Sequence, residues 1–170
     1  MLSKDRTRAL ERIGASSGTL SPITGFVCII TAIATYPSFS WTSNALSDLG
    51  IIPGITASVF NFGLIASGLL AFNFAIFGLY IHFGRNNIGK IGSAIFAAGS
   101  LSLIAIGVFN ENYSPTHYLV SVAFFTLIPI ALFIITCSFL QLNQRKIAAF
   151  TFIVGFAAAV PWILQFAFNY

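Results

Sequence analysis

TASVFNFGLIASGLLAFNFAIFGLYIHF, residues 56–83, is followed by the polar segment GRNNIGK (84–90) and then by GSAIFAAGSLSLIAIGVF (92–109). Neither apolar run contains Asp, Glu, Lys or Arg, and each exceeds the roughly 17 apolar residues that a helix needs to cross a bilayer. The basic segment between them suits a short connection at a membrane surface. The pattern predicts two transmembrane helices joined by a tight turn.

Three further apolar runs, residues 20–36, 115–142 and 147–168, extend this pattern along the chain. The chain is 57% hydrophobic and 7% charged. Soluble domains are about 45–50% apolar and about 25% charged, so water does not suit most of this surface. We therefore expect an all-α, polytopic transmembrane bundle of about five helices, forming a single domain over residues 1–170.

The positive charges should all lie at one end of this bundle. The Lys and Arg residues are Lys4, Arg6, Arg8, Arg12, Arg85, Lys90, Arg145 and Lys146. If the runs cross alternately, the positive-inside rule places this end in the cytoplasm, with the N-terminus inside and the C-terminus outside. We expect a multi-pass cell-membrane protein whose basic end contacts lipid headgroups rather than nucleic acid.

Two Ser-Pro pairs predict helix starts. Serine is a good N-cap and proline fits the first helical position, so Ser21-Pro22 should begin the first helix and Ser114-Pro115 the fourth. The first run, with its basic start and Ala32-Ile33-Ala34, also resembles a signal peptide. Cleavage there would leave four crossings.

Small residues at four-residue spacing predict close helix packing. The two stripes are Gly63, Ser67 and Ala71 on the second run and Ala94, Ala98 and Ser102 on the third. We expect them to pack together, and such faces can also mediate homo- or hetero-oligomers. Asn61 and Asn73 should form hydrogen bonds between helices.

The longest outer connection is residues 37–55, and within it Trp41 to Gly50 predicts a short interfacial helix. Asp48 would lie at the C-terminal end of that helix, where its charge opposes the dipole, so we expect it to cap the N-terminus of the second or fourth helix. An aromatic belt is expected at the outer interface, formed by Tyr36, Trp41, Tyr113, Tyr118, Trp162 and Tyr170.

Polar residues of the two outer connections form the candidate site. Asp48, Glu111 and His117 are the candidate catalytic residues and metal ligands, since carboxylates and imidazole bind metal ions and transfer protons. The candidate substrate-binding residues are Trp41, Asn44, Ser47 and Asn110. Their spacing matches no metal or nucleophile motif, so a structural hydrogen-bond network is the alternative, and the cofactor is unknown.

Four segments occur in a characteristic order: Tyr36-Pro37, Ser47-Asp48-Leu49-Gly50, Phe60 to Ile65 with Gly68-Leu69-Leu70, and Gly107 to Glu111 followed by His117. Together they resemble DUF998, a family of uncharacterised archaeal and bacterial membrane proteins. The resemblance implies a small archaeal-type polytopic membrane protein with no established activity. Many members continue into a further helix beyond the position of residues 162–170, so it also implies a short member or a missing last segment.

A looser similarity links the chain to the ceramidase and progestin-receptor-like membrane hydrolases, matched in residue type by Ser47, Asp48 and His117. Three functions follow as hypotheses. The outer polar cluster recognises lipid headgroups or a membrane partner, or it is a metal-assisted hydrolase of lipid headgroups, or the chain is an accessory subunit of a larger membrane complex. Whether the protein is an enzyme stays open.

Overall fold

The computed structural model describes the backbone of residues 4–168 and the side chains of residues 4–164. The long helices are α1 (Lys4–Ala34), α2 (Ile55–Asn73), α3 (Asn87–Val108), α4 (Thr116–Gln141) and α5 (Arg145–Phe168), and the shorter helical segments are η1 (Leu46–Gly50), η2 (Phe74–Tyr80) and η3 (Glu111–Tyr113). Five helices, one of them α2 continued by η2, are long and apolar enough to cross a membrane. The predicted all-α transmembrane bundle is confirmed.

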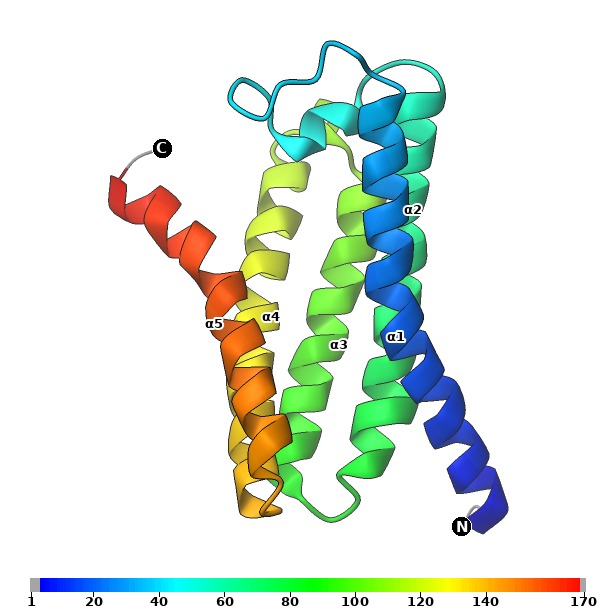
Figure 1. Cartoon of the computed structure of the whole chain (residues 1–170), viewed down its shortest axis with the longest axis vertical. Helices are drawn as coiled ribbons and strands as arrows, with labels where there is room; N and C mark the ends of the chain where they lie inside the picture. Colours follow the sequence, from blue (N-terminus) through cyan, green and yellow to red (C-terminus); the bar gives the residue numbers. More distant parts are fainter. Residues whose placement is uncertain (1–3, 169–170) are drawn as a thin grey trace.

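The long helices pack in the order of the sequence, each against the next. As Figure 1 shows, α1 and α5 stand apart, and α3 is visible between them. α1 leans outward toward its N-terminal end and α5 toward its C-terminal end. The bundle is therefore an arc of helices whose two outer members do not pack along each other.

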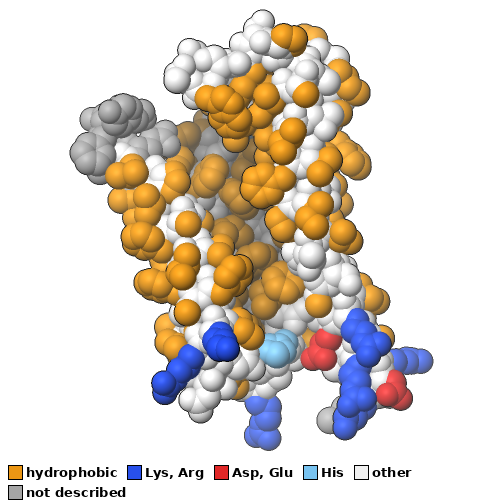
Figure 2. All heavy atoms as spheres, in the orientation of Figure 1, with side chains coloured by type: hydrophobic (Ala, Val, Ile, Leu, Met, Phe, Trp, Pro, Cys, Tyr) orange, Lys and Arg blue, Asp and Glu red, His pale blue; other side chains and the backbone are white. Residues whose placement is uncertain are grey.

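Positive charge is distributed very unequally between the two ends of the bundle. The described Lys and Arg residues lie at the start of α1, in or next to the turn before α3, and at the start of α5, and Figure 2 shows the blue side chains at this end of the bundle. We call this the basic end, and the opposite end, which carries residues 35–54 and η3, the loop end. Tyr170 of the expected aromatic belt lies outside the described residues.

The first helix begins much earlier than predicted. α1 starts at Lys4, and Pro22 lies inside it rather than at its first turn. A proline within a helix removes one backbone N–H, which transmembrane helices tolerate when neighbouring groups compensate. The Ser21 hydroxyl donates to the Ser67 carbonyl at 2.9 Å, and the Ser67 hydroxyl donates to the Ser21 carbonyl at 2.9 Å. Ser21 therefore joins two helices instead of capping one.

Other element boundaries differ by smaller amounts. α3 begins at Asn87 rather than Gly92, because the Asn86 side chain caps it by accepting from the Gly89 N–H at 2.9 Å. α4 begins at Thr116, with Pro115 as a cap residue that makes no side-chain cap bond. The interfacial helix expected from Trp41 is only the 3-10 segment Leu46–Gly50.

The small-residue stripes do not pair as predicted. Gly63 and Ser67 of α2 face α1, where a Cβ on Gly63 would overlap Cys28 and where Ser67 meets Ser21. Ala94 and Ala98 of α3 are exposed. A stripe of small residues indicates which face of a helix can pack closely, but it does not indicate which other helix packs there.

Glycines outside those stripes make the close α3 contacts. A Cβ on Gly92 would lie 2.8 Å from Ile135 Cγ1 of α4, and one on Gly107 would lie 2.7 Å from the Asn61 carbonyl oxygen of α2. The predicted interhelical role of Asn73 is confirmed, since its Oδ1 accepts from the Ser17 hydroxyl at 3.1 Å. The two glycine contacts hold α3 between α2 and α4, and the Ser17–Asn73 bond holds α1 to α2.

Candidate functional site

The Gly50 carbonyl joins the two connections of the loop end to α2. The Gly50 carbonyl accepts from Asn61 Nδ2 of α2 at 2.9 Å and from Asn110 Nδ2, beside η3, at 3.3 Å. Next to it, Leu49 is fully buried against Ala32 and Phe60. Two separate connections are thereby held over the ends of α1 and α2.

Asp48 stabilises its own short helix. Its Oδ2 accepts from Asn44 Nδ2 at 2.9 Å and from the Ala45 N–H at 3.1 Å. The prediction that Asp48 caps α2 or α4 is wrong. Because η1 begins only at Leu46, Asp48 lies near its N-terminus, where a carboxylate is favourable and finds an unsatisfied N–H within the same turn.

His117 is oriented by the backbone of the preceding connection. Its Nδ1 lies 2.7 Å from the Phe109 carbonyl oxygen. A carbonyl can only accept, so we assign the proton of this bond to Nδ1, and a neutral ring then has its lone pair at Nε2. His117 is half-buried in the first turn of α4, and Nε2 is the ring nitrogen available to a ligand.

A cavity of about 1110 Å³ lies between α1 on one side and α4 and α5 on the other, in front of α2 and α3. We call it the lateral groove. Its lining residues are Ser21, Pro22, Gly25, Phe26 and Ile29 of α1, Ala45, Leu46 and Ser47, Phe60, Leu64 and Ser67 of α2, Leu103 and Ile106 of α3, Glu111 and Ser114, His117, Tyr118, Ser121, Phe124, Phe125, Ile128 and Pro129 of α4, and Ala158, Pro161 and Trp162 of α5. Figure 2 shows a hollow running between the two sides of the molecule.

The lateral groove has a polar end and an apolar length. Ser47, Glu111, Ser114, His117 and Ser121 contribute polar groups toward the loop end. Deeper in the bundle the lining is largely aromatic and aliphatic, and the two serines there, one on α1 and one on α2, are satisfied by each other's carbonyls. Measured along α4 from His117 to Pro129, the groove is about 18 Å long at about 1.5 Å per residue.

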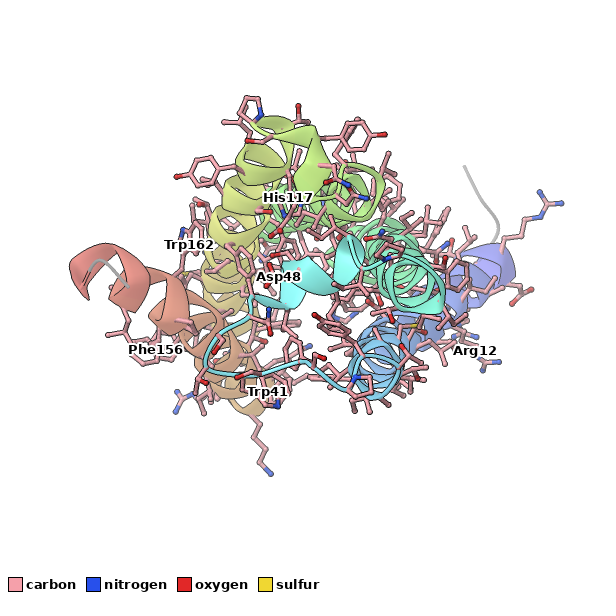
Figure 3. The ribbon with its side chains drawn as sticks, turned by 90° about the horizontal axis from the view of Figure 1, so that it is seen from above. Arg12, Trp41, Asp48, His117, Phe156 and Trp162 are labelled. Carbon is pink, nitrogen blue, oxygen red and sulfur yellow. The ribbon has the colours of Figure 1, made fainter. Side chains whose placement is uncertain are left out.

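Three of the predicted site residues line this groove: Ser47, Glu111 and His117. Three others hold the connections together, namely Asn44, Asp48 and Asn110. Trp41 is 72% exposed and packs edge-on against Phe39. In Figure 3, viewed from the loop end, His117, Asp48 and Trp162 surround the middle of the molecule, whereas Trp41 lies to one side on the loop.

The arrangement of the described side chains gives no support to the expected metal site. Within residues 4–168, no three His, Cys, Asp or Glu side chains are grouped so that they could hold a metal ion. Asp48 uses one carboxylate oxygen to cap η1. The assignment of Asp48, Glu111 and His117 as metal ligands stays a prediction that this arrangement does not support.

Sequence reasoning missed the aromatic part of the groove. Trp162 and Tyr118 were expected only as interfacial belt residues, yet both line the cavity with Phe125. The rings of Phe125 and Trp162 are stacked, with centroids 5.2 Å apart and planes 20° apart. Belt residues and groove residues carry the same sequence signal, because both are aromatic residues near a helix end.

The family described as Protein of unknown function (DUF998) matches residues 19–169. This match covers most of the chain, from the middle of α1 through α5. The chain belongs to the DUF998 family. No curated protein and no solved structure matches it, and the looser similarity to membrane hydrolases finds no support in these comparisons. For this DUF998 protein, the function must therefore be argued from the groove itself.

Proposed function

We propose that this DUF998 protein binds a single membrane lipid in the lateral groove. The lipid's headgroup lies at the polar end, near Ser47, Glu111 and His117, and its acyl chains lie along the apolar length. The observation that carries this proposal is the shape and polarity of one cavity, about 1110 Å³ in volume, with ionisable and hydroxyl groups concentrated at one end. Such a gradient matches the polarity of an amphiphile.

The setting of the groove favours a lipid over a water-soluble ligand. Its two sides are transmembrane helices that do not pack along each other, so the opening between them faces the bilayer. Small-molecule pockets usually measure about 300–1,000 Å³, and this one is at the upper limit of that range or beyond it. A lipid can enter sideways from the membrane without crossing water.

The charge distribution gives the orientation that we propose. All Lys and Arg residues lie in segments of the basic end, and cytoplasmic loops carry an excess of such residues. We therefore place the basic end in the cytoplasm and the polar end of the groove at the outer leaflet of the cell membrane.

A pair of bulky substitutions on α4 tests the proposal. Ser121 lines the groove, whereas Thr126, on the same helix, is exposed and does not line it. Ser121→Phe should fill the groove and remove the bound lipid, while Thr126→Phe adds comparable bulk elsewhere. Native mass spectrometry of protein released from mild detergent measures the outcome as the abundance of the one-lipid adduct.

Loss of the adduct in Ser121→Phe and its retention in Thr126→Phe support the proposal. An adduct that survives equally in both variants, or that is absent from the wild type, contradicts it. A wild-type dimer without lipid would point instead to a second copy covering the groove, which is the oligomer or accessory-subunit hypothesis. The metal-assisted hydrolase hypothesis stays a prediction, and no group of three metal ligands among the described residues supports it.

A further inference from the structure

The polar end of the lateral groove has one carboxylate and no positive side chain. Glu111 lines the cavity, and no Lys or Arg does. Among residues 4–168, Glu111 makes no hydrogen bond or ion pair. Every described Lys and Arg lies in a segment at the opposite end of the bundle, where the blue side chains visible in Figure 2 are found. A ligand that neutralises Glu111 must therefore bring its own positive charge.

His117 adds a second acceptor to the lining at this end of the groove. Its Nδ1–H is engaged by the Phe109 carbonyl at 2.7 Å, so the neutral ring offers a lone pair at Nε2 and no further donor. The hydroxyl groups of Ser47, Ser114 and Ser121 can also accept. The polar end is thus rich in acceptors, which suits a ligand group with several N–H donors.

An aromatic ring lines the groove at the same level. Tyr118 follows His117 on α4, and ring faces attract cations. A carboxylate, an imidazole nitrogen and a tyrosine ring together suit a primary ammonium group, whose three N–H bonds can be shared among them. A quaternary ammonium has no N–H to donate, and a headgroup with only negative charge would lie unpaired beside Glu111.

We propose that the lipid in the lateral groove carries a primary amine headgroup of the phosphatidylethanolamine type, with its ammonium group at Glu111 and His117. This inference rests on the proposed function and specifies its ligand class. The acyl chains extend past Phe125 and Ile128, and the stacked Phe125–Trp162 pair forms one wall of their path. Glu111 and His117 select the headgroup, and the apolar length accepts any acyl chain.

Photocrosslinking in nanodiscs tests the headgroup. Three lipid probes carry the same diazirine-bearing acyl chain and an ethanolamine, choline or glycerol headgroup. Crosslinked peptides of α1 and α4 are quantified by mass spectrometry for the wild type, Glu111→Gln and the control Glu11→Gln, which makes the same change at the basic end. We expect about tenfold more groove crosslinking by the ethanolamine probe than by the glycerol probe in the wild type, typical of a charge-assisted hydrogen bond.

Glu111→Gln should reduce this preference severalfold, and Glu11→Gln should leave it unchanged. Equal crosslinking of all three probes to groove peptides would overturn the amine assignment while leaving lipid binding in place. Equal yields from the ethanolamine and choline probes would overturn the primary-amine assignment. Absence of groove crosslinks from every probe would overturn the proposed function as well. The ranking of probes in the wild type needs no variant, so a Glu111→Gln protein that failed to fold would not prevent the test.

Discussion

The half of the bundle toward the basic end and the half toward the loop end differ in how closely the helices pack. We call them the basic half and the loop half. Toward the basic end, one apolar cluster joins Leu79 and Phe83, at the end of η2, to Ile135 and Phe139 of α4 and Ala148 of α5, and Phe96 of α3 packs against it. Toward the loop end, the corresponding cluster of Ala32, Leu49 and Phe60 involves only α1, η1 and α2. The core therefore closes at one end, and at the other it stops short of α4 and α5.

The lateral groove occupies the space left by that difference. α5 leaves α4 toward its C-terminal end in Figure 1, and Pro161, which removes the helical bond to the Ala157 carbonyl, lies in that part of the helix. In a bilayer such an opening costs little, because lipid tails are as apolar as the side chains that they touch. Close packing in the basic half and an open loop half can thus coexist within one domain.

The largest predicted effect tests the closed half. Ile135 of α4 is 2% exposed, within the basic-end cluster and against Gly92 of α3, so Ile135→Ala leaves a cavity and should lower the free energy of unfolding by about 2–4 kcal/mol. Ile130→Ala makes the same change on the same helix at a position that is 43% exposed, and should have little effect. Unfolding in a graded mixture of mild detergent and dodecyl sulfate measures both. If both variants lowered the free energy of unfolding equally, the basic half would not be the closely packed part of the bundle.

A smaller effect is expected where the loop end is fastened. Asn61→Ala removes the donor to the Gly50 carbonyl, which keeps its longer bond from Asn110, and should cost about 1 kcal/mol locally. Amide hydrogen exchange of residues 46–50 should become faster, with the basic half unchanged. Asn112→Ala, at an exposed position of η3, is the control. Unchanged exchange in Asn61→Ala would mean that the buried Leu49 and the Asn110 bond hold the loop without Asn61.

The smallest effect concerns the middle of the bundle, between the two halves. Ser67→Ala removes one of the two hydroxyl-to-carbonyl bonds between α1 and α2, and bonds between transmembrane helices are worth about 0.6 kcal/mol on average. Ser102→Ala removes a hydroxyl that bonds only within α3, to the Ala98 carbonyl, and should cost less. The same detergent unfolding measurement compares them. A Ser67→Ala loss no greater than that of Ser102→Ala would show that the serine pair does not hold α1 in place.

The site was only partly predictable. Glu111, His117 and Ser47 were recognised because polar residues between apolar runs are few, and all three line the groove. Asp48 was given a partner on another helix because its own helix was predicted to begin at Trp41; the shorter η1 changed its position from C-terminal to N-terminal. Which residue caps a helix depends on where the helix begins, to within a few residues, and hydrophobic periodicity does not determine that position.

The sequence by itself determined that this is a transmembrane helical bundle, where its charges lie and which family it belongs to. Those properties depend on the length of apolar runs and on the order of residues, and both can be counted along the chain. Only the tertiary structure decided that Gly63 faces α1, that Gly92 faces α4, and that a groove separates α1 from α5. The physical reason is that a lipid-facing residue and a core residue are equally apolar, so helix contacts in a membrane depend on shape, which composition does not record.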